Sequence, residues 1–553
     1  MARSPRKKEA EPVVKTINRL AFASIDYLIC VYMLMVIVGL PFYFKEGYTY
    51  IATRKNTFFS SSSVTIAKVM AVLIPVYAGT GMALYYRENH TLLPRMTGKE
   101  IVSWIRRRFN RVDAFVGLYG LALCLSYLCT RYSDSAGWGA NGWYMGFYTQ
   151  MILVCSYFFI SKLWTPRKMY FYLILGVSSV VFALGYLNRF SVYPIEMALS
   201  SPSYISTIGN INWYCGYVTA VFFAGAAYFW QGGGNKWWKK ILLMGYIFLG
   251  FSTLVTQGSA SGIAALGAGM FVMFLLSAGD EWRMLWFWVE ALLLSAACLF
   301  SRGLRDLLPG QLNFEDGYMD FMITGWLPIT LTIVSCIGLA GVGLLVKKKK
   351  YSKKLFSAIA VVIVTVASCC VLAVISAIVV NTLHPGSLGA LSEHSFFTYS
   401  DAWGSRRGAT WKAGAMCFAE QDLGHKLVGV GPDAMAAYLY SDGSEELLAV
   451  VTESFGNSRL TNAHNEWLTV LVNTGVLGLA GFGGMMISGL TVLLKKRSKG
   501  KLACACGLCL VPYTVNNIFS FQQIMNVTVI FVLLGMGMAF GREKDSGIQS
   551  KLR

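Results

Sequence analysis

The chain is poor in charged residues, and this scarcity excludes the ordinary soluble classes of protein. Only 14% of its 553 residues are Asp, Glu, Lys or Arg, whereas soluble domains carry roughly 25%. Hydrophobic residues make up 55% and the mean hydropathy is +0.52. Apolar runs of about 20 residues, the length needed to cross a bilayer, recur along nearly the whole chain. The composition therefore predicts an all-α polytopic membrane protein.

A cysteine framework is also lacking. The 13 cysteines form neither a disulfide pattern nor CxxC-type metal spacing in the segments between the apolar runs. Most lie inside the runs, and Cys417 is alone in the longest connecting segment. Cys504, Cys506 and Cys509 are close together within one apolar run, where packing as small hydrophobes is favoured over metal binding.

Ionisable residues are scarce inside the apolar runs, where Glu290 and Lys68 are the main exceptions. Because ion-coupled transporters usually need ionisable groups deep in the membrane, this scarcity argues against that class. A cleaved signal peptide is not expected either. The first apolar run is too long and has no small-residue cleavage site, so it is predicted to be an ordinary first span.

Fourteen apolar segments are predicted to cross the membrane, with boundaries good to about 2–4 residues. They are 21–43, 64–86, 112–130, 142–161, 170–187, 210–230, 241–256, 260–278, 284–300, 321–346, 355–380, 466–494, 502–519 and 524–540. The chain divides into a bundle of eleven helices (1–380), a loop subdomain (381–465) and three further helices with a tail (466–553).

The net charge of +20 is interpreted as a topology signal. With the N-terminus in the cytoplasm, most Lys and Arg fall on the cytoplasmic side, as the positive-inside rule requires. The clusters are Arg106–Arg108, Lys347–Lys350 and Lys495–Arg497. This distribution predicts that both termini are cytoplasmic and that the 381–465 loop is extracytoplasmic. It gives no reason to expect a nucleic-acid partner, and contact with anionic membrane lipids is a by-product.

The large loop contains one clear helical pattern. Trp411, Ala415 and Phe418 follow Arg407 at i+4, i+8 and i+11, which indicates an amphipathic helix. Gly424 is expected to break that pattern, 427–432 to form a tight extended turn, and Pro432-Asp433 to open a short helix. Residues 441–461 are predicted to form an irregular, mobile flap.

His464 is the residue best placed for chemistry, because it stands where this loop enters the apolar segment 466–494. Asn462 is a plausible N-cap of that segment. The positive end of a helix dipole disfavours the imidazolium, so the ring is expected to be neutral and able to accept a proton near pH 7. The alternative is a purely structural role, in which His464 lies at the membrane interface and only caps the helix or forms a hydrogen bond.

Arg406 and Arg407 are adjacent in the same loop, and Arg459 is a third arginine close to His464. Guanidinium groups bind phosphate oxygens bidentately and stay charged. The arginine pair could hold the pyrophosphate of a lipid carrier, or simply bridge to loop acids such as Asp401. Polar residues at the same end of the bundle form a weaker group, which capping or helix packing could also explain: Asn210, Asn212, Ser259 and Ser261.

The chain resembles the O-antigen ligase / O-antigen polymerase family of bacterial polysaccharide enzymes, especially its Gram-positive forms. The resemblance is carried by four elements in order: Arg407-Gly408-Ala409-Thr410-Trp411, Gly429-Val430-Gly431-Pro432-Asp433, Ala463-His464-Asn465-Glu466 with Leu468, and Gly475-Val476-Leu477-Gly478-Leu479. The resemblance is clear over residues 400–480 and weak in the rest of the chain.

The resemblance implies a GT-C-type helix bundle that transfers a glycan from an undecaprenyl-pyrophosphate donor to an acceptor, outside the cytoplasmic membrane. It implies His464 as general base, Arg407 with its neighbour Arg406 as pyrophosphate ligands, and Asn465 as the residue that orients His464. It implies neither a metal nor another cofactor. One departure is Ala260, where many members carry arginine; Arg459, Arg302 or Arg189 could substitute.

The sequence leaves three alternatives open. Within the enzyme class, the chain could polymerise repeat units or ligate a finished glycan, since only the acceptor (a glycan, a lipid or a protein) differs. A lipid-linked oligosaccharide flippase can also have about fourteen spans. A non-catalytic scaffold for envelope assembly is the third alternative.

Overall fold

The computed structural model describes residues 13–91, 97–197, 203–313, 317–495 and 500–542. Its first part contains α1 (Val13–Leu34), η1 (Met35–Gly39), α2 (Leu40–Phe42), α3 (Ile51–Asn89), α4 (Gly98–Arg108), α5 (Arg111–Cys129), α6 (Ser133–Ala136), α7 (Phe147–Lys162) and α8 (Lys168–Arg189). A short antiparallel hairpin, β1 (Tyr204–Ile205) and β2 (Gly209–Asn210), precedes α9 (Ile211–Trp230).

The middle part contains α10 (Trp237–Thr256), α11 (Ala260–Ser277), α12 (Glu281–Leu307), α13 (Gly317–Ile323), α14 (Leu327–Lys347) and α15 (Lys353–Leu383). A segment of short helices follows: η2 (Gly389–Glu393), η3 (Ser395–Phe397), α16 (Trp403–Glu420), α17 (Leu423–Val428), α18 (Met435–Ser441) and α19 (Glu445–Phe455). The chain closes with α20 (Glu466–Lys495), α21 (Lys501–Leu508), α22 (Leu510–Asn516) and α23 (Ile524–Arg542).

Eleven helices among the described residues are long and apolar enough to cross a membrane, so the prediction of an all-α polytopic membrane protein is confirmed. Each of the fourteen predicted segments coincides with helical structure. Three of them, which correspond to α7, α9 and the pair α21–α22, are not among the eleven. The count of fourteen therefore stays a prediction.

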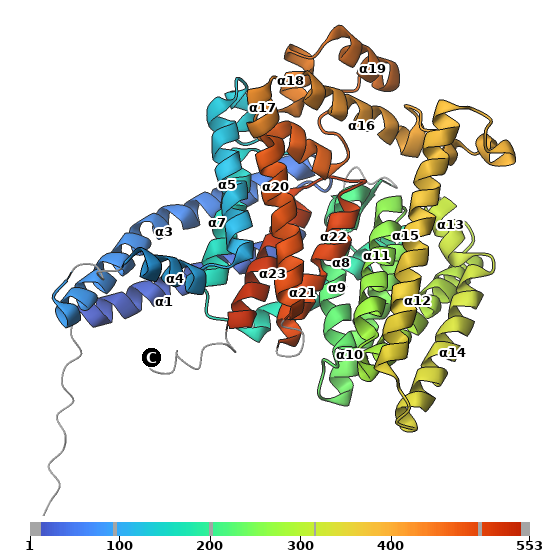
Figure 1. Cartoon of the computed structure of the whole chain (residues 1–553), viewed down its shortest axis with the longest axis horizontal. Helices are drawn as coiled ribbons and strands as arrows, with labels where there is room; N and C mark the ends of the chain where they lie inside the picture. Colours follow the sequence, from blue (N-terminus) through green and yellow to red (C-terminus); the bar gives the residue numbers. More distant parts are fainter. Residues whose placement is uncertain (1–12, 92–96, 198–202, 314–316, 496–499, 543–553) are drawn as a thin grey trace, which may run out of the picture.

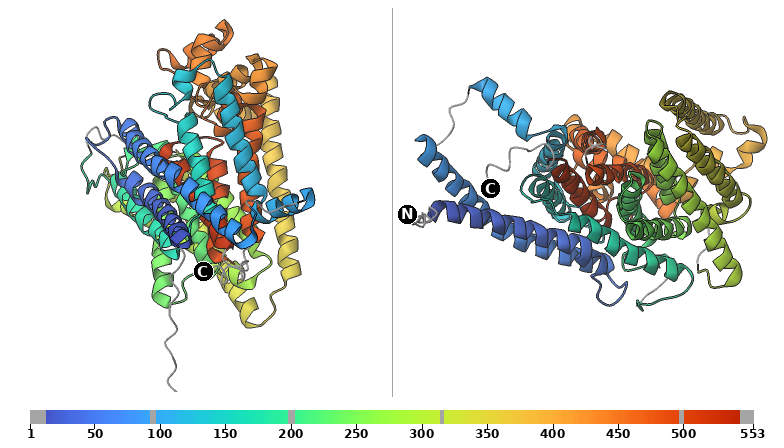
Figure 2. Two further views of the ribbon diagram at one scale, coloured as in Figure 1. Left: turned by 90° about the vertical axis from the view of Figure 1, so that its left-hand side faces the viewer. Right: turned by 90° about the horizontal axis from the view of Figure 1, so that it is seen from below.

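The loop subdomain forms a cap at one end of the bundle, and we use "the cap" for residues 384–465. Figures 1 and 2 both show it above the bundle helices, between the end of α15 and the start of α20. The Lys347–Lys350 cluster lies at the other end, because it precedes α15, whose far end enters the cap. Lys496 and Arg497 of the third cluster, and both chain ends, lie outside the described residues.

The prediction of an irregular flap at 441–461 is wrong, because 445–455 forms α19. Ser444 caps this helix by accepting a hydrogen bond from Leu447 N at 3.1 Å. Leu447, Val450 and Val451 are its buried face, and α19 packs on α16. The predicted break after the α16 pattern is present but lies earlier than Gly424, because α16 ends at Glu420. Gly424 itself lies within α17, which Asp422 caps through His425 N at 2.9 Å.

The cap is attached to the bundle where two glycine-rich segments pack backbone to backbone. Val430 N donates to Val472 O at 3.2 Å, and Gly431 N donates to Asn473 O at 3.0 Å. Gly475 has φ +65, and a Cβ there would lie 2.3 Å from the Leu427 carbonyl carbon. Only glycine permits both this left-handed conformation and this approach. The α17–α18 turn therefore fits against the kink of α20.

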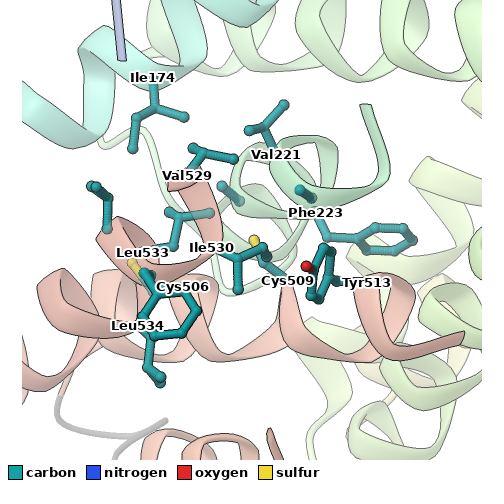
Figure 3. Close-up of a cluster of buried hydrophobic side chains, with 14 of the residues drawn as sticks. Ile174, Val221, Phe223, Cys506, Cys509, Tyr513, Val529, Ile530, Leu533 and Leu534 are labelled. Carbon is teal, nitrogen blue, oxygen red and sulfur yellow. The ribbon is translucent and has the colours of Figure 1, made fainter. Parts of the chain in front are cut away.

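The bundle core is apolar and surrounds α23, which packs against α7, α9 and α21. Figure 3 shows side chains from α8, α9, α21, α22 and α23 interleaved there, Ile530 among them. Cys506 and Cys509 are fully buried in the same cluster. These cysteines therefore pack as small hydrophobes, as the sequence predicts.

Candidate functional site

His464 is held in a left-handed backbone conformation (φ +48) just before α20. Its N–H donates to Asn462 Oδ1 at 2.9 Å, which closes a local side-chain turn. Asn465 instead caps α20, because its Oδ1 accepts from Leu468 N at 3.1 Å. The two asparagines thus exchange their expected contacts: Asn462 fixes His464, and Asn465 starts the helix.

The imidazole of His464 is half-buried and meets the ring of Phe521 edge-on, with centroids 5.0 Å apart. Burial and, to a smaller extent, the positive charge of Arg407 together lower the pKa of His464 to about 4. The ring is therefore neutral at pH 7, as predicted. Burial is the dominant cause.

Arg407 comes from the cap and reaches the same loop of the bundle as His464. Its Nε donates to Phe519 O at 3.0 Å and its Nη1 donates to Gly404 O at 2.8 Å. Burial lowers the pKa of Arg407, but a guanidinium stays protonated at any physiological pH. Phe519 and Phe521 lie on one loop, so Arg407 and His464 bind to it two residues apart.

Arg406 and Arg459 point elsewhere. Both are exposed; the guanidinium of Arg406 lies 5.9 Å from the Phe455 ring centroid, and that of Arg459 lies 4.8 Å from the Tyr440 ring centroid. Gly404, Ser405 and Arg406 are all left-handed, and successive residues at a helix start do not face the same way. The structure therefore brings one of the three arginines, Arg407, to His464.

The polar residues predicted near the starts of α9 and α11 make local contacts. Asn210 caps α9 by accepting from Asn212 N at 2.9 Å, and the hydroxyls of Ser259 and Ser261 are 2.8 Å apart. Ser261 Oγ is 3.7 Å from Cys215 Sγ on α9. Ser261 therefore links α11 to α9 inside the bundle.

Of the arginines that could replace the one absent at Ala260, Arg189 is the nearest to the serine-rich turn. It is fully buried, and its Nη2 donates to Gln257 O at 2.6 Å, one residue before that turn begins. Arg302 lies on α12, with Nε 3.9 Å from Asp306 Oδ2. Arg189 therefore fixes the backbone at the start of the serine-rich turn by this hydrogen bond.

Sequence reasoning missed the loop between α22 and α23, residues 517–523. Asn517 O accepts from Glu466 N at 2.8 Å, and Gln522 N donates to Glu466 Oε2 at 2.8 Å. Glu466 therefore joins this loop to the His464 turn by its backbone and its side chain. The signal was the polar run Asn516-Asn517…Ser520…Gln522-Gln523 between two apolar segments.

This loop and the last residue of α22 carry buried polar atoms that have no hydrogen-bond partner within the described residues: Asn516 Nδ2, both polar atoms of the Asn517 side chain, Ser520 Oγ and Gln522 Nε2. Buried polar groups are usually satisfied, because leaving one unpaired costs about 1–3 kcal/mol. Their concentration beside His464 and Arg407 marks a region prepared for a polar ligand or for water.

A second buried acid, Asp433, lines a cavity together with Phe521. Its Oδ2 accepts from Ala140 N at 2.8 Å and from Met145 N at 3.1 Å, and burial raises its pKa to about 7. Asp433, Glu466, Gln522 and Phe521 line a cavity of about 20 Å³. That volume is enough for one water molecule.

The fold defines a multi-pass helical membrane protein in which a capped end of the bundle holds a neutral histidine and a half-buried arginine against the same loop. No protein-family model matches the chain, and no curated protein sequence matches it. The family resemblance of the 400–480 region therefore remains a hypothesis, and the function must be argued from the site itself.

Proposed function

We propose that the protein is a membrane glycosyltransferase that moves a glycan from an undecaprenyl-pyrophosphate-linked donor to an acceptor hydroxyl. One observation carries the proposal: Arg407 and His464, 57 positions apart in the chain, converge on the loop 519–521. A permanent cation and a neutral imidazole side by side, at the junction of a cap and apolar helices, suit a lipid-linked anionic leaving group.

In the proposed reaction, His464 removes the proton of the acceptor hydroxyl as its oxygen attacks the anomeric carbon of the donor. The bond from that carbon to the pyrophosphate oxygen breaks, and the bonding electrons leave with the lipid pyrophosphate. Arg407 donates hydrogen bonds to the departing pyrophosphate, a kind of electrostatic stabilisation worth about 3–4 kcal/mol. The attack inverts the anomeric centre.

In the protein without substrate, a pKa of about 4 makes His464 a weak base. Binding of the donor should raise this pKa. The pyrophosphate brings negative charge next to Arg407, so it offsets the positive field that disfavours the imidazolium. The pKa of His464 then rises when the donor binds, toward the range in which a general base is most effective at neutral pH.

The topology proposed with this function has fourteen spans, both termini in the cytoplasm and the cap outside the cytoplasmic membrane. It rests on the positive-inside distribution of Lys and Arg. The acceptor decides between a polymerase and a ligase. The two carboxyl oxygens of Glu290 favour the second candidate, a flippase, because they are buried in α12 without a partner among the described residues.

The test is purified protein in detergent with a defined undecaprenyl-pyrophosphate oligosaccharide, scored for chain extension and for transfer to an added acceptor. We expect transfer by the wild type, and loss of transfer with retained folding in His464→Ala. In cells, the variant should accumulate lipid-linked precursor outside the membrane. Accumulation inside, with Glu290→Gln giving the same defect, would instead support the flippase.

A further inference from the structure

Helix α20 is folded back on itself at Gly475, whose φ of +65 interrupts the helix. The residues before and after Gly475 form two arms. Trp467 on the first arm meets Phe482 on the second edge-on, with ring centroids 5.2 Å apart. In a straight helix these two residues, 15 positions apart, would be separated by roughly 22 Å. The first arm therefore lies alongside the second, and it begins at Glu466.

Glu466 holds the 517–523 loop at two points. Its backbone N–H donates to Asn517 O at 2.8 Å, and its Oε2 accepts from Gln522 N at 2.8 Å. The residue is only 7% exposed, so water has little access to the side-chain bond. Because the two attachment points bracket residues 518–521, the position of these residues depends on Glu466.

The bracketed residues make both contacts of the loop with the candidate site. Phe519 O accepts the hydrogen bond from Arg407 Nε at 3.0 Å, and the ring of Phe521 lies edge-on to His464 at 5.0 Å between centroids. Ser520 lies between them, and its Oγ has no partner among the described residues, so this side chain does not fix the loop. A shift of the loop would therefore move the anchor of the guanidinium and the wall of the imidazole together.

We propose that Glu466 is a positioning residue for the transfer reaction, which fixes His464 and Arg407 in one geometry by holding the 517–523 loop against the His464 turn. The inference rests on the proposed function and adds a residue that acts without touching the substrate. A displacement of about 1 Å at a catalytic group can cost about 10²-fold in rate. The backbone bond survives any substitution of Glu466, so mutation tests the side-chain bond to Gln522.

Three substitutions separate position from charge. Glu466→Gln keeps an acceptor at the same side-chain length but removes the negative charge. Glu466→Asp keeps the charge on a side chain that is one methylene shorter, and Glu466→Ala removes the acceptor. We expect Glu466→Ala to lower kcat about 10²-fold, Glu466→Gln to stay near wild type, and Glu466→Asp to lose more than Glu466→Gln.

The matched control is the neighbouring residue. Trp467→Phe removes the hydrogen bond from its Nε1 to Thr514 O on α22, 3.2 Å long, and leaves the loop attached to Glu466. This variant should keep wild-type turnover. A loss as large as that of Glu466→Ala would show that any weakened contact in this region lowers the rate, and it would overturn the inference.

A double-substitution cycle tests whether Glu466 acts through Arg407. When Arg407 is already alanine, Glu466→Ala should cost less than about tenfold in kcat, because the Phe519 carbonyl then has no guanidinium to hold. Fully additive losses would contradict the proposal, as would wild-type kcat in a folded Glu466→Ala protein or greater activity in Glu466→Asp than in Glu466→Gln. If Glu466→Ala does not fold in detergent, Glu466→Asp takes its place in the cycle.

The pKa of His464, followed by NMR of histidine-labelled protein and assigned with His464→Ala, needs no substrate. It is about 4 in the intact protein and should rise toward the ordinary value of about 6.5 in Glu466→Ala, but not in Glu466→Gln. Both variants lack the charge of Glu466, so a difference between them reports the position of the loop. If wild type transfers no glycan, the proposed function fails, whereas this difference would still support the positioning role. Equal pKa values in the two variants would overturn it.

Discussion

Two buried regions of this protein have opposite chemistry. The core around α23 is closed by apolar side chains such as Ile530 and Leu533, and its cysteines are packed as hydrophobes (Figure 3). The junction under the cap is also buried. It keeps amide and hydroxyl groups on the 517–523 loop that have no partner in the described part of the chain, two buried acids and a water-sized cavity. Burial alone therefore does not distinguish scaffold from site. The two regions differ in how many buried polar atoms lack a partner among the described residues: the core cluster of Figure 3 includes one, Tyr513 Oη, whereas the junction gathers several.

The comparison predicts that the largest loss of activity, with little loss of stability, comes from His464. His464→Ala should lower kcat by about 10²–10⁴-fold, the usual contribution of a general base, while the melting temperature in detergent changes little. Arg406→Ala, on the other side of the same helix start, is the control and should keep near-wild-type turnover. A wild-type rate in His464→Ala would reduce the histidine to a structural role.

The pH profile of the wild type sharpens this prediction. The rate should rise as pH increases through the pKa of His464, because only the neutral ring accepts a proton. In kcat/KM, which reports the free enzyme, this limb should lie at about pH 4. In kcat it should lie at higher pH, since bound pyrophosphate favours the imidazolium. Coincident limbs would contradict a donor that binds beside Arg407.

Substitution of Arg407 should cause the next largest loss of catalytic activity. Arg407→Ala should lower kcat/KM by about 10²–10³-fold, in line with the loss of one preorganised donor to a developing negative charge. Arg407→Lys should recover only part of this loss, because lysine keeps the charge but not the bidentate fork. Steady-state kinetics with the lipid-linked donor checks both variants. Equal activity of Arg407→Lys and wild type would show that charge alone is required.

In the apolar core the expected effect is on stability instead. Ile530 is fully buried within the α23 cluster, and its truncation to alanine should lower the free energy of unfolding by about 2–5 kcal/mol. Ile487, which is 66% exposed, gives the control, and Ile487→Ala should have a much smaller effect. Unfolding in detergent measures both. Specific activity per folded molecule should be unchanged in Ile530→Ala.

The smallest predicted effect is a change in the pH dependence of stability, and it should come from Asp433. Its folded pKa is raised to about 7, so the folded state binds more protons than the unfolded state between about pH 4 and 7, and stability should fall as pH rises through that window. The slope for one proton is at most about 1.4 kcal/mol per pH unit. Asp433→Asn keeps the acceptor for Ala140 and Met145 N–H and should flatten this dependence, as thermal unfolding at several pH values would test. An unchanged slope would place the titrating group elsewhere.

The helical architecture, the position of His464 at the start of α20 and the helix α16 could all be predicted from sequence, although the buried face of α16 is centred on Ala409, Ala413 and Cys417 and not on the predicted stripe that begins at Arg407. Each depends on local information: an apolar run, a helical period or the entry of a loop into a span. The prediction of a flap at 441–461 failed because the short apolar face of α19 is diluted by polar neighbours, and only packing against α16 makes it decisive.

What tertiary structure alone decided is which of these residues meet. The sequence puts Arg406 and Arg407 together, but the left-handed turn at 404–406 sends one toward α19 and the other toward Phe519. In the sequence, His464 is far from the 517–523 loop. In the fold, Glu466 joins that loop to the His464 turn by two hydrogen bonds. Local patterns specify helices because helical periodicity spans only a few residues. Contacts between distant segments depend on how those helices pack, which no local pattern encodes.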